Sequence, residues 1–314
     1  MSYIDKNELI DCCNRIQSYI HRTPVLTSRA INGIVGAEVY FKCENFQRMG
    51  AFKMRGATNA IMQLTDEQKR AGVVTHSSGN FAQALALGAR NLGVTPHIVM
   101  PESAPRVKKE AVKGYGGIVY ECESNPQARE REAERIRKET GATFIHPSND
   151  WNVILGQGTA CKELLEECPD LSSVFTPVGG GGLIAGTALY AHFFGNSCRV
   201  FGGEPYACDD AYRSLRSGVI ETNATTNTIA DGLKTNLGDV NFPIIRQYVT
   251  DIIRVSEEEI VASMRLIWER MKIVVEPSSA VALAALISDR DTFKGKKVGV
   301  ILSGGNVDLS NLPF

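Results

Sequence analysis

A lysine in a glycine-flanked segment is the first residue of this sequence whose surroundings suit covalent chemistry. The segment reads GAFKMRGA over residues 50–57, and Lys53 stands where a helix is predicted to begin. The positive end of a helix dipole disfavours a further positive charge, so this amine should lose its proton more readily than a solvated lysine. A neutral amine is the nucleophile that forms a Schiff base with a carbonyl group. Judged by spacing alone, a solvated surface lysine, the fate of most lysines, is the favoured interpretation of this segment.

A run of four glycines predicts a binding site for a phosphate group. The run, GGGGLIAG over residues 179–186, follows an apolar strand pattern and precedes an apolar helix pattern. Glycines let the backbone approach an anion closely, and the N–H groups at the start of a helix attract negative charge. The spacing of Gly180, Gly182 and Ala185 also fits the dinucleotide-binding fingerprint, with Glu204 near the place of its ribose-binding acid. Both interpretations stay open on these residues alone.

Two further segments place serine, glycine and asparagine directly after a predicted strand. They are THSSGNFAQA over residues 75–84 and ILSGGNVDL over residues 301–309. Hydroxyl and N–H groups at the start of a helix suit a carboxylate, and Asn80 is placed to hydrogen-bond a ring oxygen. The alternatives are an ordinary helix N-cap for the first segment and a C-terminal turn for the second.

The elements that must position these segments follow an alternating pattern of strands and helices. Short apolar, β-branched runs predict buried strands, and the stretches between them, such as 80–93 and 125–141, carry helical patterns. Such alternation predicts parallel sheets covered by helices, and the number of strands favours two sheets. The predicted strands are 39–44, 72–77, 97–101, 117–121, 143–147, 173–178, 199–203 and 297–303.

Composition excludes several classes of protein. The 314 residues include 34 basic and 35 acidic side chains, and this balance gives no electrostatic reason to expect nucleic acid or an anionic membrane as a partner. No apolar run approaches the ~20 residues that cross a bilayer, and the polar N-terminus lacks a signal-peptide core. We therefore expect a soluble, cytoplasmic protein whose eight cysteines are reduced thiols.

The four segments resemble those of the fold-type II pyridoxal-phosphate enzymes, and most of all the serine racemase / threonine-serine dehydratase group, in their order along the chain: GAFKMRGA, SSGN, GGGG and SGGN. The resemblance covers nearly the whole chain and favours pyridoxal 5'-phosphate over a dinucleotide. It implies a tryptophan synthase β-like α/β fold, with two open twisted, mostly parallel sheets and flanking helices. It also implies a large cofactor-binding domain from residues 1–68 and 149–314, and a small inserted domain from 69–148. A homodimer is the further expectation.

The resemblance also implies a role for individual residues. Lys53 would carry the cofactor as a Schiff base and move the α-proton of the substrate, and Ser78 would act as acid or base on the opposite face. The implied cofactor contacts are Phe52, Lys53, Asn80, Gly179, Gly180, Gly181, Gly182, Leu183, Glu276 and Ser303. The implied substrate contacts are Ser77, Ser78, Gly79, Asn80 and Arg129. On spacing alone, Arg129 is equally well explained as a solvated helix position.

The activity that the resemblance implies is interconversion of L- and D-serine, with elimination of water from L-serine to pyruvate and ammonia. The alternative within the same chemistry is a dehydratase for L-threonine or L-threo-3-hydroxyaspartate. A non-catalytic amino-acid or nucleotide-binding protein on the same scaffold is disfavoured because Lys53 is intact. Two residues depart from the group: Phe81 stands where relatives usually have His, and Ser148 where they often have Asn, Phe or Tyr.

A cation site is implied by the stretch EPYACDD, residues 204–210, which resembles a metal-binding stretch of the group. Glu204 and Asp210 would supply carboxylates, and Cys208 its backbone carbonyl, to Mg²⁺ or Ca²⁺. Hard oxygen ligands suit both ions. A solvated acidic turn is the alternative interpretation.

Overall fold

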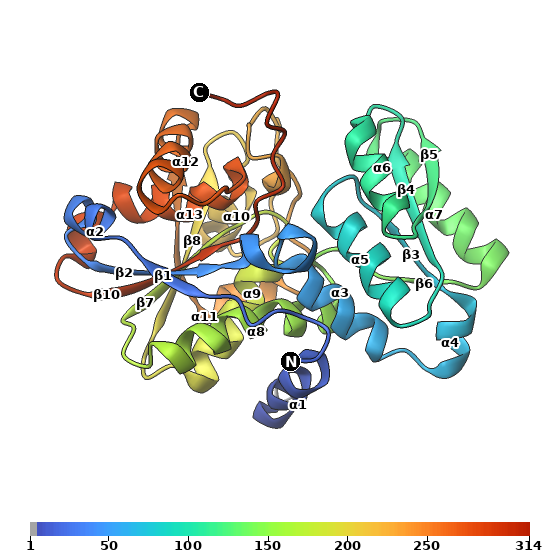
Figure 1. The fold of residues 1–314 in the computed structure, drawn as a ribbon, viewed down its shortest axis with the longest axis horizontal. Helices are drawn as coiled ribbons and strands as arrows, with labels where there is room; N and C mark the ends of the chain where they lie inside the picture. Colours follow the sequence, from blue (N-terminus) through green and yellow to red (C-terminus); the bar gives the residue numbers. More distant parts are fainter. Residues whose placement is uncertain (1–4) are drawn as a thin grey trace.

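Six strands form the larger of two sheets in the computed structural model, which describes residues 5–314 of the chain (Figure 1). Neighbouring strands are parallel except at one edge, where β1 runs antiparallel to β2. Across the sheet the order is β1 (Val25–Thr27), β2 (Glu38–Cys43), β10 (Lys297–Leu302), β7 (Ser173–Pro177), β8 (Arg199–Pro205) and β9 (Val249–Val255).

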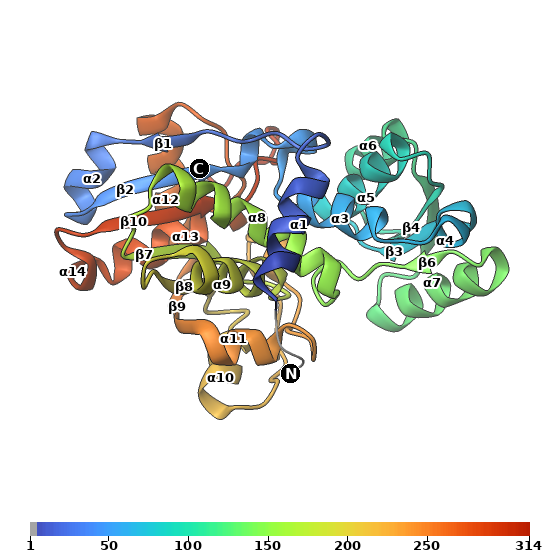
Figure 2. The same cartoon turned by 90° about the horizontal axis from the view of Figure 1, so that it is seen from below.

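Helices cover both faces of this sheet because successive strand residues point to opposite sides. Val174 on β7 packs into the core beneath α8 and α9, whereas its neighbour Phe175 packs into the second core, beneath α12 and α13. Figure 1 shows the sheet between these two layers, and Figure 2 looks from below onto the layer of α8, α9 and α11. The helices of this lobe are α1 (Lys6–Ile16), α2 (Arg29–Val35), α8 (Trp151–Glu167), α9 (Gly182–Phe194), α10 (Asp210–Ser217), α11 (Phe242–Tyr248), α12 (Glu257–Met271), α13 (Pro277–Ser288) and α14 (Arg290–Phe293).

The smaller sheet is wholly parallel and is built from the middle of the chain. Its order is β5 (Ile118–Cys122), β4 (Pro96–Pro101), β3 (Val73–His76) and β6 (Thr143–Phe144). Its helices are α4 (Asp66–Ala71), α5 (Asn80–Asn91), α6 (Arg106–Gly114) and α7 (Pro126–Thr140). Helix α3 (Lys53–Met62) lies between the lobes and packs against α8 of one and α5 of the other (Figure 1). Short 3₁₀ turns are η1 (Glu44–Phe46), η2 (Arg48–Gly50) and η3 (Asp231–Leu233).

The prediction of two mostly parallel sheets with flanking helices is confirmed. All eight predicted strands are present, although the one expected at 143–147 is a two-residue strand, because the chain leaves the sheet after Phe144 to return to the large lobe. The pattern missed β1 and β9. The expected domain limits at 68/69 and 148/149 stay a prediction, and residues 1–4 of the first segment lie outside the described residues.

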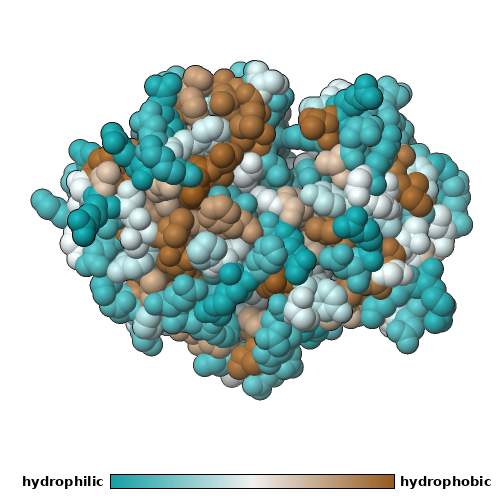
Figure 3. Space-filling model, in the orientation of Figure 1, coloured by the Kyte–Doolittle hydropathy of each residue, from teal (hydrophilic) through white to brown (hydrophobic). Residues whose placement is uncertain are grey.

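The fold brings the predicted functional segments together. Strands β7 and β10 are parallel neighbours, so the glycine run after β7 and the segment after β10 emerge at the same edge of the large sheet. The serine segment follows β3 of the small sheet. Figure 3 shows the surface notched between the two lobes. Within residues 5–314, no helix is both long and apolar enough to cross a membrane.

Candidate active site

Backbone hydrogen bonds fix the segment that carries Lys53. The N–H of Phe52 donates to the carbonyl of Ser303 at 3.0 Å, and the N–H of Gly305 donates to the carbonyl of Gly50 at 2.9 Å. Ala51 and Gly304 form an isolated antiparallel bridge between these bonds. The start of α3 is therefore hydrogen-bonded to the segment that follows β10, which brings the Lys53 segment and the SGGN segment side by side.

The amine of Lys53 lies among apolar rings and one carbonyl. Its Nζ donates to the carbonyl oxygen of Pro147 at 2.8 Å and lies 5.0 Å and 5.7 Å from the ring centroids of Phe52 and Phe81. Burial lowers the pKa of Lys53 to about 8, and the carboxylate of Glu276 opposes this shift. A substantial fraction of the amine is therefore neutral near neutral pH, as a nucleophile requires.

Asn80, at the start of α5, is held by two partners from the large lobe. Its Nδ2 donates to both carboxylate oxygens of Glu276, at 2.9 Å and 3.1 Å, and its Oδ1 accepts from Nδ2 of Asn306 at 2.9 Å. Burial, reinforced by the nearby Asp231 anion, raises the pKa of Glu276 to about 7, while the hydrogen bond from Asn80 opposes the rise. These contacts join the two lobes beside Lys53.

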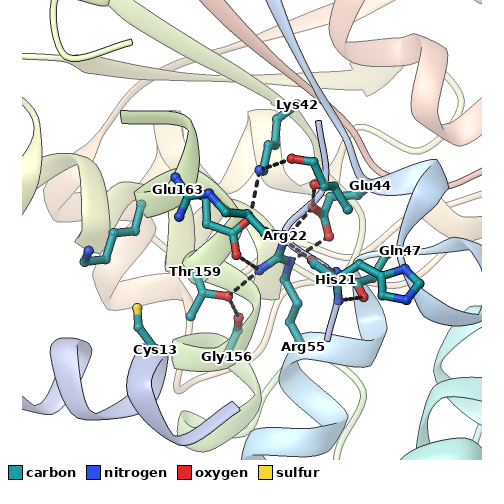
Figure 4. A network of polar contacts seen from close by, with 12 residues as sticks. Cys13, His21, Arg22, Lys42, Glu44, Gln47, Arg55, Gly156, Thr159 and Glu163 are labelled. Carbon is teal, nitrogen blue, oxygen red and sulfur yellow. Dashed lines mark hydrogen bonds and ion pairs between the residues drawn. The ribbon is translucent and has the colours of Figure 1, made fainter. Parts of the chain in front are cut away.

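A buried ion network holds α3 from its other side (Figure 4). The guanidinium of Arg55 makes paired hydrogen bonds to Glu44, at 2.7 Å and 2.8 Å, and to Glu163, at 2.7 Å and 2.8 Å. Its Nη1 also donates to Thr159 at 3.1 Å. Nζ of Lys42 contacts Glu163 at 2.8 Å. Arg55, Glu44 and Lys42 have no exposed side-chain surface, so this network fixes α3 against β2, η1 and α8.

The glycine run forms a tight cradle at the start of α9. A side chain on Gly179 would place its Cβ 2.8 Å from the carbonyl oxygen of Gly232, and one on Gly182 would place it 2.7 Å from Oε1 of Gln157. Across residues 5–314, no hydrogen-bond acceptor is found for the N–H groups of residues 180–182. A close-packed loop with free N–H donors at a helix start fits the phosphate of pyridoxal phosphate. Leu183, next in the chain, is buried.

The serine segment lies at the end of β3 on the small lobe. Ser77 accepts a long hydrogen bond, 3.4 Å, from the N–H of Gly79, and no hydrogen bond of the Ser78 hydroxyl is found in the described part of the chain. Burial lowers the pKa of the adjacent His76, and the positive charge of Arg129 on α7 lowers it further. The structure therefore places Arg129 near this segment, half-buried rather than fully solvated.

Glu204 and Asp210 form a buried pair of carboxylates at the end of β8. The oxygens of Glu204 accept from the N–H groups of Ala211, at 3.0 Å, and Tyr212, at 2.8 Å. Those of Asp210 accept from Asn223 at 2.5 Å and from the N–H of Leu237 at 3.0 Å. Burial raises the pKa of Asp210 to about 6 and raises that of Glu204 strongly, with Asp210 adding to the rise. Two acids this deeply buried exclude the solvated acidic turn.

The structure thus gathers Lys53, Asn80 and Glu276 with the end of β10. Ser303 is buried, and its backbone carbonyl accepts a hydrogen bond from the N–H of Phe52. Sequence reasoning missed three positions. Asn306 had a usable signal, since SGGN repeats the serine-glycine-asparagine pattern of residues 77–80. Arg55 and Asn241 had none, because charged or helix-capping residues are expected at the surface.

Comparisons with known proteins agree with this geometry. A family model described as pyridoxal-phosphate-dependent enzyme matches residues 16–304. The chain is 48% identical to a serine racemase of Dictyostelium discoideum, over 99% of this chain and 98% of the relative. It is 46% identical to a β-hydroxyaspartate dehydratase of Paracoccus denitrificans, over 98% of each chain. The crystal structure of the Dictyostelium discoideum serine racemase matches with a TM-score of 0.93 and 48% identity, covering 96% of this chain and 98% of that one.

Replacing Arg55 should destabilise the fold. Arg55→Met leaves the carboxylate of Glu44 buried without its cation and leaves Glu163 with Lys42 alone, and loss of one partner of a buried ion pair costs about 3–5 kcal/mol of unfolding free energy. Urea unfolding measures the change. Arg135→Met on α7 is the control, because the ion pairs of Arg135 with Glu132 and Glu139 lie at the surface and contribute little. Equal effects of the two substitutions would contradict the assigned role of the buried network.

The reactivity of Lys53 should follow its lowered pKa. When cofactor-free protein is mixed with pyridoxal phosphate, the rate of Schiff-base formation should rise with pH around a midpoint near 8, because the neutral amine reacts. In Glu276→Gln the midpoint should move lower, since the carboxylate that favours the ammonium form is gone. Stopped-flow visible absorbance gives both curves. A midpoint near the ordinary lysine value of 10.5 would refute the prediction.

Proposed function

The chain belongs to the family of pyridoxal-phosphate-dependent enzymes, and on this premise we propose that it interconverts L- and D-serine and also eliminates water from L-serine. The observation that carries the proposal is the buried Lys53, whose pKa is lowered to about 8; the half-buried Ser78, which follows β3 and lies two residues before Asn80, supports it. The likeness to serine racemases over nearly the full chain supports the choice of serine as substrate.

The groups that we propose for cofactor and substrate are those that the resemblance implies, and the geometry of Lys53 and of the glycine run supports them. Lys53 would hold the cofactor, residues 179–182 its phosphate, and Asn80 and Ser303 its ring. Residues 77–79 would bind the substrate carboxylate through N–H and hydroxyl groups at the start of α5. When bound, the cofactor withdraws electrons from the α-carbon of the amino acid and makes the α-hydrogen acidic.

Two proton-transferring groups then account for racemisation. Nζ of Lys53, released as a free amine once the amino group of L-serine has replaced it, would take the α-proton on one face. Oγ of Ser78 returns a proton to the other face, which gives D-serine. Proton transfer by a positioned group contributes roughly 10²–10⁴-fold in rate.

Elimination shares the first of these transfers. After Lys53 removes the α-proton, the β-hydroxyl would leave as water by taking up a proton, for which Nζ of Lys53 is the available donor. One water molecule then hydrolyses the remaining imine to pyruvate and ammonia. Because both outcomes begin with the same proton removal, one protein is expected to catalyse both.

A dehydratase for L-threo-3-hydroxyaspartate or L-threonine is the second candidate. The 46% identity to a β-hydroxyaspartate dehydratase supports it, as does the position of Arg129. This half-buried cation lies close enough to His76 to lower its pKa, and His76 directly precedes the serine segment. The guanidinium group of Arg129 would bind the second carboxylate of hydroxyaspartate by charge-assisted hydrogen bonds.

A single time course distinguishes the candidates. With L-serine, both D-serine and pyruvate should accumulate, and Ser78→Ala should reduce D-serine formation roughly 10²–10⁴-fold while pyruvate continues to form. Chiral chromatography and a pyruvate assay on the same samples give the two rates, and Ser172→Ala, outside the site, is the control. Pyruvate without D-serine, together with faster turnover of hydroxyaspartate or threonine, would replace the racemase by the dehydratase.

We further propose that Glu204, Asp210 and the carbonyl of Cys208 bind Mg²⁺ or Ca²⁺. The residues fit such an ion because both carboxylates are buried, burial raises the pKa of each, and the charge of Asp210 raises that of Glu204 further. Oxygen ligands of this kind are those that both ions prefer. The neighbouring Asp209, by contrast, is already paired with Arg213 and Arg254.

Divalent cations should therefore stabilise the protein. Mg²⁺ or Ca²⁺ should raise the melting temperature of the wild type above that in EDTA, because an ion that binds only the folded state stabilises it. Asp210→Asn should lose most of this rise, whereas Asp170→Asn, at an exposed pair with Lys297, should keep it. Differential scanning fluorimetry measures the shifts. If the cations raise the melting temperature of Asp210→Asn as much as that of the wild type, the proposed cation site is wrong.

Three broader expectations belong to the same proposal. The resemblance to the group supports a homodimer. The eight cysteine thiols suit a reducing compartment such as the cytoplasm. Formation of the smaller sheet by a continuous middle segment supports a small domain at 69–148 within a large domain at 1–68 and 149–314.

A further inference from the structure

Asn241 occupies the N-cap position of α11 but does not cap that helix. An asparagine at this position usually accepts a hydrogen bond from the first turn of its own helix. Here Oδ1 accepts from the N–H of Gly238, in the preceding loop, at 3.1 Å. Nδ2 donates to the carbonyl oxygen of Gly180 at 2.8 Å and to that of Ser148 at 3.1 Å. The side chain is fully buried, and its amide hydrogen-bonds the glycine run instead of capping α11.

The bond to Gly180 fixes the direction of one peptide group. In a trans peptide the carbonyl and the following N–H point in opposite directions. When Asn241 holds the carbonyl of Gly180, the N–H of Gly181 must point away from Asn241. No partner for that N–H is found among residues 5–314, so it remains available as a donor.

Such a restraint is needed because glycine peptides have few intrinsic preferences. Gly181 has a φ of +81°, a conformation that glycine adopts at no steric cost. Without a restraint, the Gly180–Gly181 peptide can reverse and present its carbonyl oxygen to an anion, which repels it. Asn241 also packs directly on this residue: a Cβ on Gly181 would lie 2.8 Å from Oδ1 of Asn241.

From these contacts we infer that Asn241 is a positioning residue for the cofactor phosphate. It holds the Gly180–Gly181 peptide with its N–H toward the phosphate and its carbonyl away, and it ties the loop of Ser148 to the same place. Asn241 itself does not touch the phosphate. The inference depends on the pyridoxal-phosphate site and is independent of which amino acid is the substrate.

The test compares two forms of the cofactor that differ in the phosphate group. In Asn241→Asp the side chain keeps its size and its acceptor for Gly238 but loses the donor to Gly180. Affinity for pyridoxal phosphate, measured by absorbance titration of cofactor-free protein, should fall about 10- to 100-fold. This is the range for one lost hydrogen bond to a charged group, here the bond from the N–H of Gly181 to the phosphate. Affinity for pyridoxal, which lacks the phosphate, should stay near that of the wild type.

Inorganic phosphate provides a readout that needs no Schiff base. Phosphate should raise the melting temperature of cofactor-free wild type and have a much smaller effect on Asn241→Asp. Asn59→Ala is the matched control: Asn59 is equally buried and donates its Nδ2 to a backbone carbonyl, that of Asn152, at 2.7 Å. This control should lose stability and still keep the wild-type preference for pyridoxal phosphate over pyridoxal.

The possible results separate the inference from the cofactor site itself. An unchanged ratio of the two affinities in Asn241→Asp, or an equal fall in both, overturns the role of Asn241. If the aspartate variant does not fold, Asn241→Ser, which is uncharged and keeps one hydroxyl donor, should show a smaller loss confined to pyridoxal phosphate. If wild-type protein prefers pyridoxal phosphate no more than pyridoxal, the glycine run is not a phosphate site and the inference fails with it.

Discussion

Arg55 buries a guanidinium group without any exposed surface, and the position of the reactive lysine depends on the ion pairs that satisfy it. Two carboxylates face this group in paired geometry, and Lys42 supplies a second cation, so the charges balance only when all the segments are present. An incomplete set would leave a buried charge uncompensated, which costs several kcal/mol. The network therefore makes β2, η1, α3 and α8 assemble together. Because Lys53 lies two residues before Arg55, it is fixed along with them.

The second constraint is electrostatic and acts between the lobes. Lys53 and Glu276 are both buried, and burial moves the pKa of each toward neutrality, to about 8 and about 7. The carboxylate keeps the lysine from losing its proton more easily, and Asn80 keeps the carboxylate from becoming a stronger base. Asn80 lies at the start of α5 on the small lobe, so a hydrogen bond between the lobes opposes the rise in the pKa of the carboxyl group beside Lys53.

Much of the fold could be predicted from sequence because strands buried on both faces are continuous apolar runs. Strand β9 was missed because its sequence, VTDIIRV, includes Asp251 and Arg254 at the edge of the sheet, where charged side chains reach solvent or ion partners. The order of the functional segments located the site, since carboxyl ends of parallel strands meet at one edge. Arg55 and Asn241 could not be found, because their roles depend on partners about 100 and 60 residues away in sequence. No local pattern records such a pairing.

The return of the chain from the small sheet to α8 shows how these constraints combine. Nδ1 of His146 accepts from the N–H groups of Ser148 and Asn149, at 3.1 Å and 2.8 Å, which requires a neutral ring. Burial lowers the pKa of His146 to about 4 and keeps the ring neutral. The ordered segment then presents two carbonyls, that of Pro147 to Lys53 and that of Ser148 to Asn241. Backbone atoms make both contacts, whereas the side chain of Ser148 packs against the glycine run, where a Cβ on Gly180 would collide with its Oγ.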